Sequence, residues 1–492
     1  MGILAFVFAA ALAQQQTPCE ALRALPLRAA AVTGAEFVPA GPQSTGRRGQ
    51  GVQLPAHCRV SMTLTPSSDS RIEMELWMPA ENWNGNFLAV GNGGWAGTIE
   101  RGALAAGLAR GYAAASNDTG HTGGSASFAL GHPEKVVDFG YRAMHEMAVQ
   151  SKLVIQAYYT RGPRLSYYQG CSTGGRQGLM AAQRYPEDFD AIVAGAPVYN
   201  QIHLNVSQVA RQIAMLRDPS RLVPASKVAL LARAVLAACD GQDGVEDGIV
   251  GDPRRCSFDP SALACEAGDA PDCLTEAQVA SAKSAYAPVT TRAGALVYPG
   301  HSPGFENGWR IPTPGGAINP LFADMPRYIG RQDPDWDVMS FDLDADLVLA
   351  IGNAGFIEAS DPDLSRFKAR GGKLLLYHGW ADPGPAPENT INYHTSVAAR
   401  LGGAQDDWMR LFLLPGVGHC GGGVGPDQVD YLGALERWRD AGVAPDQPIA
   451  TRGAGRGGAT PMSRPICPFP QVARYRGSGS TSDAANFTCA AP

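Results

Sequence analysis

Short apolar runs recur along the chain, and each one ends in glycines or polar residues. Short runs that are apolar throughout are typical of central strands in a sheet that is covered on both faces. One segment, residues 71–78, instead alternates polar and apolar side chains, which predicts a half-buried strand. The uniformly apolar runs predict further strands within residues 86–94, 111–121, 165–172, 189–197, 371–382 and 410–420.

Helix-like stretches lie between some of these predicted strands, within residues 140–159, 175–184 and 428–439. Strands that alternate with helices predict a mainly parallel α/β sheet. Residues 201–365 interrupt this pattern, because they hold many prolines and few clear strand–helix units. The pattern resumes at Gly371, so we predict a catalytic domain made of residues 14–200 and 366–492, with residues 201–365 inserted into it.

Charge excludes some classes of partner. The 492 residues carry a formal net charge of −6, and no run of Lys or Arg stands out. We therefore expect neither a nucleic-acid partner nor a polybasic contact with a membrane surface.

The N-terminus and the cysteines indicate a compartment. Residues 3–12 are apolar but too short to span a bilayer, and Ala11-Leu12-Ala13 resembles a cleavage signal. These features predict a signal peptide over residues 1–13, although no basic residue precedes the apolar run; a buried N-terminal helix is the alternative. Ten cysteines without a CxxC pair then predict disulfides in a secreted or periplasmic protein.

A serine between glycines is the first candidate for catalysis. Gly170-Cys171-Ser172-Thr173-Gly174 fits G-x-S-x-G after a predicted strand and before a predicted helix, which is the context of a nucleophile elbow. The motif also occurs as a plain structural turn. A reactive thiol directly before the proposed nucleophile raises the question of what Cys171 does.

A nucleophilic serine needs a base, and the base needs a carboxylate that orients it. In this architecture the order along the chain is Ser, Asp, His, each at a strand end. Asp382 and His419 end two predicted strands in that order. His121 precedes the serine, and His378 lies inside a predicted strand, where we interpret it as structural or pocket-lining.

An oxyanion hole requires two backbone N–H groups. One should belong to the residue after the nucleophile, which is Thr173, and the other to a glycine-rich loop after an early strand. Residues 91–95 (GNGGW) form such a loop, and either Gly94 or Gly93 would supply the second N–H. A plain turn is the alternative interpretation of this loop.

These motifs together resemble the tannase and feruloyl esterase family, which also contains mono(hydroxyethyl) terephthalate hydrolases. The resemblance extends from about Trp77 to the C-terminus. It implies an α/β-hydrolase fold with a large inserted lid, and a serine esterase with a CS-D-HC pattern that maps onto Cys171-Ser172, Asp382 and His419-Cys420. The matching segments are WNGNFLAVGNGGWAG (83–97), GYAAASNDTGHTG (111–123), YYQGCSTGGRQGLMAAQRYPEDFDAIVAGAP (167–197), HGWADP (378–383) and GVGHCGGG (416–423).

The resemblance also implies how the cysteines pair, which the sequence alone leaves open. The implied disulfides are Cys171–Cys420 beside the active site, then Cys19–Cys58, Cys239–Cys256, Cys265–Cys273 and Cys467–Cys489.

A calcium site in the lid is a further implication of the resemblance. The acidic loop at residues 239–249 alternates aspartates with glycines and offers hard oxygen ligands, although it lacks the EF-hand spacing. A solvated acidic turn is the alternative. We expect a structural Ca²⁺ and no cofactor for catalysis; its ligands would be Asp240, Asp243, Asp247 and the carbonyls of Val245 and Ile249.

The resemblance implies a small-molecule substrate, an ester of an aromatic acid of the feruloyl, galloyl or phthalate-monoester type. An apolar wall and a polar anchor for it are expected in the insertion, although each candidate taken singly is more typical of lid core or solvated surface. An acyltransferase and an inactive calcium-stabilised binding module are the alternative functions, and we expect a monomer or homodimer. The wall candidates are Trp309, Arg310, Phe322 and Arg327, with Phe305, Tyr328 and Phe341.

Overall fold

A nine-stranded sheet forms the centre of the computed structural model, which describes residues 17–44, 51–313, 316–453 and 461–492. Every neighbouring pair from β7 to β13 is parallel, and the pairs from β1 to β7 are antiparallel. The mainly parallel α/β sheet expected from the sequence is therefore present, with an antiparallel edge. In sheet order the strands are β1 (Ala30–Val38), β4 (His57–Leu64), β5 (Ile72–Pro79), β7 (Ala113–Asn117), β6 (Asn86–Val90), β8 (Leu165–Cys171), β9 (Ala191–Gly195), β12 (Lys373–Gly379) and β13 (Met409–Leu414).

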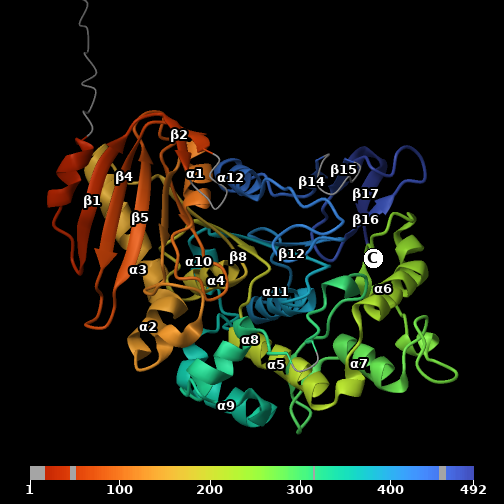
Figure 1. Cartoon of the computed structure of the whole chain (residues 1–492). Helices are drawn as coiled ribbons and strands as arrows, with labels where there is room; N and C mark the ends of the chain where they lie inside the picture. Colours follow the sequence, from red (N-terminus) through yellow and green to blue (C-terminus); the bar gives the residue numbers. More distant parts are fainter. Residues whose placement is uncertain (1–16, 45–50, 314–315, 454–460) are drawn as a thin grey trace, which may run out of the picture.

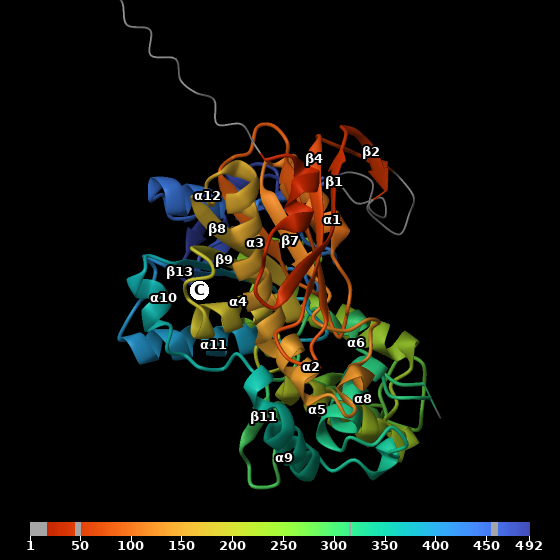
Figure 2. The ribbon, with the colours of Figure 1, turned by 90° about the vertical axis from the view of Figure 1, so that its left-hand side faces the viewer.

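Helices cover both faces of this sheet, as its mainly apolar parallel strands require. One apolar cluster packs helices α1 (Arg101–Ala109) and α12 (Tyr431–Ala441) on one face. A second cluster packs three helices on the other face (Figure 1 and Figure 2). These helices are α3 (Ala143–Tyr159), α4 (Thr173–Arg184) and α11 (Pro387–Leu401).

Strand β5 corrects one expectation. Its alternating sequence predicts a half-buried strand, but both of its faces are covered, and Glu75 is only 3% exposed. Arg59 and Arg101 donate to the Glu75 carboxylate at 2.9 and 2.7 Å. Burial alone would raise the pKa of Glu75, but these bonds outweigh it and lower the pKa. The Glu75 carboxylate thus has its hydrogen-bond partners inside the protein and does not need water.

The described residues of the segment between β9 and β12 add no strand to the central sheet. Helices α5 (Gln201–Arg217), α7 (Glu276–Tyr286), α8 (Pro320–Asp324) and α9 (Leu343–Ala354) lie below the sheet in Figure 1. We call the inserted residues 201–365 the lid. One apolar cluster of the lid also contains Trp95 and Phe139, which belong to the catalytic part, so the two parts share an apolar core. The other α-helices and strands of this segment are α6 (Ala225–Cys239), β10 (Val289–Thr290), β11 (Leu296–Tyr298) and α10 (Ser365–Ala369).

The C-terminal tail lies against the lid. Its last strands form two antiparallel pairs, and the second pair, drawn in dark blue, lies above α6 in Figure 1. Arg464 in this tail pairs with Asp247 in the acidic loop of the lid. The paired strands are β14 (Ile449–Arg452) with β15 (Met462–Pro465), and β16 (Val472–Tyr475) with β17 (Phe487–Ala490).

The predicted signal peptide, residues 1–13, lies outside the described residues. Among the residues that are described, no helix combines the length and the apolar character needed to cross a membrane.

Candidate active site

Ser172 lies at a sharp turn between β8 and α4. Its φ of 65° is in the left-handed region, which is costly for a residue with a side chain and is found where structure holds a functional group in place. The turn is held by the Ser172 N–H, which donates to the Gly195 carbonyl at 2.9 Å. A Cβ on Gly174 would lie 3.0 Å from the Asn92 carbonyl oxygen, so the glycine allows the helix to approach the neighbouring loop. This geometry is that of a nucleophile elbow.

Asp382 and His419 follow β12 and β13, and the sheet brings their loops together. The Asp382 Oδ2 atom lies 2.6 Å from His419 Nδ1. A Cβ on Gly379 would lie 2.1 Å from the Val417 carbonyl oxygen, so the end of β12 packs directly on the loop that carries His419. Asp382 is buried, whereas the His419 side chain is 32% exposed.

The electrostatics of this pair favour an ionised carboxylate. Burial alone would raise the pKa of Asp382, but the neighbouring His419 and His378 outweigh it and lower the pKa to about 2. Asp382 therefore carries a negative charge at neutral pH. Such a charge orients the imidazole of His419 and stabilises its protonated form.

Ser172 and His419 line one cavity of about 290 Å³ beneath the lid. The described residues include no hydrogen bond from Ser172 Oγ to His419, and this contact often tightens only when substrate binds. A cavity of this volume accommodates a substituted aromatic ring, since benzene enters engineered cavities of about 150 Å³. The wall is mainly apolar and includes Val198, Leu204, Leu321, Phe322 and Pro385.

The loop proposed for the oxyanion hole faces the same cavity. Gly93, Gly94 and Thr173 all line it, and no described group accepts a hydrogen bond from their N–H groups. Thr173 Oγ1 donates to the Gly94 carbonyl at 3.0 Å and so joins the loop to the elbow. The indole N–H of Trp95 donates to the Leu321 carbonyl of the lid at 2.9 Å. The loop is thereby held in place, and either glycine remains a candidate for the second donor.

All ten cysteines lie in the described residues and form five disulfides, in the pairs that the family resemblance implied. The Cys171–Cys420 bond joins the residue before Ser172 to the residue after His419, and both cysteines line the cavity. Cys171 is therefore a cross-link and not a competing nucleophile.

The acidic loop shows a partial fit to a cation. The Asp240 carboxylate accepts from the N–H groups of Asp247, Gly248 and Ile249, so backbone donors already use its oxygens. No group of three or more His, Cys, Asp or Glu side chains among the described residues is arranged to hold a metal ion.

Two observations nevertheless favour a cation in this loop. Burial, with repulsion from neighbouring carboxylates, raises the pKa of Asp243 to about 6. Asp247 Oδ1 is buried and makes no hydrogen bond, although Arg464 pairs with the other oxygen. Calcium here stays a prediction, with Val245 and Ile249 as carbonyl ligands.

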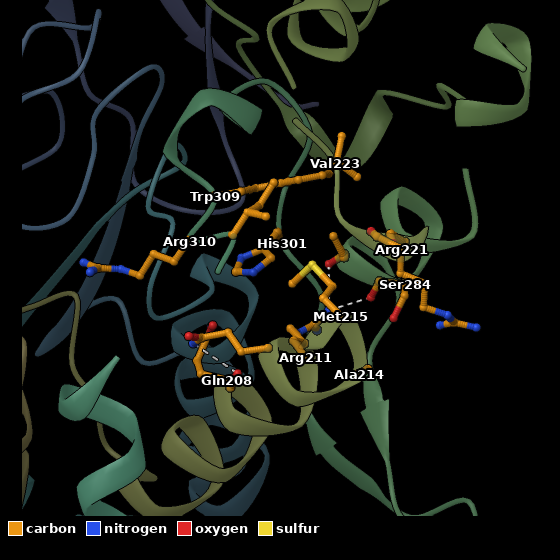
Figure 3. Close-up of a pocket in the computed structure, with 14 residues that line it drawn as sticks. Gln208, Arg211, Ala214, Met215, Arg221, Val223, Ser284, His301, Trp309 and Arg310 are labelled. Carbon is orange, nitrogen blue, oxygen red and sulfur yellow. Dashed lines mark hydrogen bonds between the residues drawn. The ribbon is translucent and has the colours of Figure 1, made fainter. Parts of the chain in front are cut away.

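The predicted wall residues lie in different places, and only some of them line the cavity of Ser172. Phe322 and Arg310 line the cavity of Ser172, whereas Trp309 lines a neighbouring cavity of about 50 Å³ that also contacts Arg310. Figure 3 shows this second cavity, with Arg310 directed away from the other labelled side chains. Arg327 lines neither of the two, and Phe305, Tyr328 and Phe341 do not line the cavity of Ser172. Phe341 and Tyr328 pack in or against the lid core, which shows why aromatic residues alone cannot identify a cavity wall.

Sequence reasoning missed the contribution of α5. Gln201, Leu204 and Asn205 occupy one face of this helix and line the cavity. Their spacing of three and four residues is a helical stripe, but such a stripe is equally typical of a packed core. It therefore gives no signal for a site without the structure.

Comparison with known proteins identifies the family. The model of the family described as "Tannase and feruloyl esterase" matches residues 58–490. The chain belongs to the tannase and feruloyl esterase family.

Among its relatives is an uncharacterized esterase of Xanthomonas campestris, 38% identical over 97% of this chain and 92% of the relative. Another is the mono(2-hydroxyethyl) terephthalate hydrolase of Piscinibacter sakaiensis, 34% identical over 89% of this chain and 85% of the relative. The crystal structure of feruloyl esterase B from Aspergillus oryzae superposes with a TM-score of 0.90, at 31% identity over 96% of this chain and 99% of that one. The chain is therefore a carboxylic-ester hydrolase with the α/β-hydrolase fold.

Proposed function

We propose that the enzyme is a serine esterase that cleaves esters of aromatic acids through an acyl-enzyme on Ser172. The observation that carries this proposal is the 2.6 Å contact between Asp382 and His419 in the wall of the cavity that contains Ser172. Because Asp382 binds Nδ1 of His419, the other ring nitrogen, Nε2, is left to accept the serine proton.

In the first half of the reaction, Ser172 Oγ attacks the ester carbonyl carbon while His419 Nε2 takes the hydroxyl proton. The carbonyl oxygen becomes an oxyanion, which the N–H of Thr173 and the N–H of Gly93 or Gly94 would stabilise. The carbon–oxygen bond to the alcohol then breaks, and His419 returns its proton to the leaving alkoxide. In the second half, water attacks the acyl-enzyme by the same steps and releases the free acid.

The substrate class follows from the cavity and from the relatives. Relatives of this chain are named for feruloyl esters and for a hydroxyethyl terephthalate, both esters of aromatic acids. The apolar wall would hold the aromatic ring. Arg310 is exposed at the cavity, has its guanidinium 5.8 Å from the ring centre of Phe322, and makes no ion pair with any described residue. A second carboxylate on the substrate ring would pair with it.

We propose that the enzyme works outside the cytoplasm, in a secreted or periplasmic setting. Five disulfides in one chain support this, because disulfides persist in oxidising compartments. The proposed Ca²⁺ would be structural, since the acidic loop is not among the residues that line the cavity of Ser172.

The test is a panel of methyl ferulate, methyl gallate and the hydroxyethyl monoester of terephthalate. Wild type should release acid from at least one of them, and Ser172→Ala should release none. Ser396→Ala, an exposed serine of α11, is the matched control and should keep full activity. Activity in Ser172→Ala would refute the nucleophile, and wild type without activity on the whole panel would refute the substrate class.

An acyltransferase would use the same acyl-enzyme with an alcohol as acceptor. The same assay with added ethanol separates the two functions, because a transferase should form the ethyl ester faster than the free acid. The alternative of an inactive binding module would require that no ester is cleaved.

A further inference from the structure

His378 makes contacts that its position inside a strand did not predict. It is the penultimate residue of β12, and its side chain is fully buried. Its Nε2 atom lies 3.1 Å from Asp382 Oδ2 and 3.2 Å from the Pro385 carbonyl oxygen. Its Nδ1 atom lies 2.7 Å from the hydroxyl of Thr390 on α11.

These partners fix the proton on the imidazole of His378. Both partners of Nε2, a carboxylate and a carbonyl, only accept hydrogen bonds, so Nε2 carries a proton. In the neutral ring Nδ1 then accepts, and the Thr390 hydroxyl is a donor of suitable position. Thr390 thus selects the form of His378 that donates to Asp382.

Asp382 consequently receives three donors. His419 Nδ1 and His378 Nε2 both contact Oδ2, at 2.6 and 3.1 Å, and the Gly384 N–H contacts Oδ1 at 2.8 Å. Donors on both oxygens fix the plane of the carboxylate. The second imidazole also shares the charge that would otherwise act on His419 alone.

We propose that His378, held by Thr390, is a positioning residue that orients Asp382 toward His419 and limits how strongly Asp382 stabilises protonated His419. This inference rests on the proposed role of His419 as the base. It makes His378 part of what sets the pH range of the reaction, although His378 does not line the cavity of Ser172.

Other titratable groups surround this pair. His301 and Tyr298 approach Asp382 from the lid, but burial lowers the pKa of His301 to about 3 and raises that of Tyr298, so neither changes charge near neutrality. Glu388 on α11 faces His378 and Arg254, and burial raises its pKa. Glu388→Gln therefore shows whether a feature of the pH profile belongs to Glu388 instead.

Two substitutions of His378 separate donation from packing. His378→Gln keeps an N–H donor of similar reach, and His378→Leu fills the space without a donor. Thr390→Val removes the hydroxyl at nearly constant shape. We expect kcat on methyl ferulate to fall by about 10- to 100-fold in His378→Leu, the range found for residues that orient metal-binding histidines, with KM little changed. His378→Gln should recover most of this loss, and Thr390→Val should lie between them.

The pH profile gives the second readout. Without the donor from His378, Asp382 acts on His419 alone, so the acid limb of kcat/KM should move to higher pH in His378→Leu and return in His378→Gln. His394→Leu is the matched control, because His394 contacts Phe469 and not Asp382, and it should leave kcat and the limb unchanged. The proposal would be overturned if His378→Gln and His378→Leu had equal kcat values. It would also be overturned if the acid limb of kcat/KM stayed at the same pH in His378→Leu.

A measurement without turnover separates this proposal from the proposed function. Histidines labelled with ¹⁵N can be titrated by NMR in the Ser172→Ala background, where His419 is followed directly. Its titration midpoint should be higher with His378→Leu than with His378→Gln. If the midpoints coincide, the positioning role fails, whatever esters the wild type cleaves.

Discussion

The Cys171–Cys420 disulfide connects the elbow to the histidine loop, and removing it separates its effect on stability from its effect on catalysis. The perturbation is the double variant Cys171→Ala/Cys420→Ala, which leaves the other four disulfides intact. The bond joins residues 249 positions apart. The chain-entropy relation for a loop of that length gives about 5.5 kcal/mol of stabilisation, as an upper value.

This free energy converts into a modest change in melting temperature. Unfolding entropy is about 2.1 cal/mol/K per residue, or about 1 kcal/mol/K for a chain of this length, so Tm should fall by about 5 °C. The matched control is Cys265→Ala/Cys273→Ala in the lid, whose bond spans 8 positions. The same relation gives about 2.5 kcal/mol and a fall of about 2 °C for this control.

The effect on catalysis should distinguish the two variants more sharply. Ser172 and His419 are neighbours of the bonded cysteines, and a displacement of about 1 Å between reacting groups costs up to about 100-fold in rate. We expect kcat on methyl ferulate to fall at least tenfold in the Cys171/Cys420 variant and to stay unchanged in the Cys265/Cys273 variant. Calorimetry and initial rates below both Tm values measure these outcomes. Equal losses of kcat in the two variants would refute the idea that this bond holds Ser172 and His419 in register.

Three further outcomes are expected. Removal of Ca²⁺ with a chelator, or Asp247→Asn, should lower Tm by a few degrees while the rate at 25 °C changes little; an unchanged Tm would contradict the calcium site. Arg310→Ala should raise KM about tenfold for the terephthalate monoester and leave KM for methyl ferulate unchanged, and equal changes would exclude a carboxylate contact. Because the pKa of Asp382 is about 2, below its ordinary 3.8, the stability that it contributes is present above about pH 4 and is lost as the pH falls through 2. Asp382→Asn should remove that part of the acid dependence in urea titrations and lower kcat by about 10⁴-fold, whereas an unaltered acid dependence would contradict the low pKa.

Much of the central fold could be predicted from local patterns in the sequence. Strands β6, β8, β9, β12 and β13 are mainly apolar because both faces of the sheet are covered, so each appears in the sequence as a short apolar run. The candidate triad follows from strand ends, because parallel strands place their C-terminal ends at one edge of the sheet. The G-x-S-x-G motif and the order Ser, Asp, His along the chain were therefore sufficient to identify Ser172, Asp382 and His419 as candidates.

The features that the sequence did not reveal depend on contacts between distant segments. Strands β1 and β4 at the edge of the sheet carry polar residues and were not predicted. Burial of Glu75 requires Arg59 from β4 and Arg101 from α1, which no local pattern relates to it. The role of His378 likewise depends on Asp382 in the following loop and on Thr390 in α11.

The lid is joined to the catalytic machinery at both of its sides. The Trp95 indole N–H donates to the Leu321 carbonyl on the oxyanion side, and Gln208 donates to the Gly384 carbonyl on the side of Asp382. A lid that swung away as a rigid flap would break both bonds and separate Leu321 from the loop that holds Gly94. Because the lid also shares its apolar core with Trp95, such an opening would expose buried surface as well. The lid is therefore a fixed wall that completes the cavity, and under the proposed function the residues that this wall presents, Arg310 among them, would select the substrate.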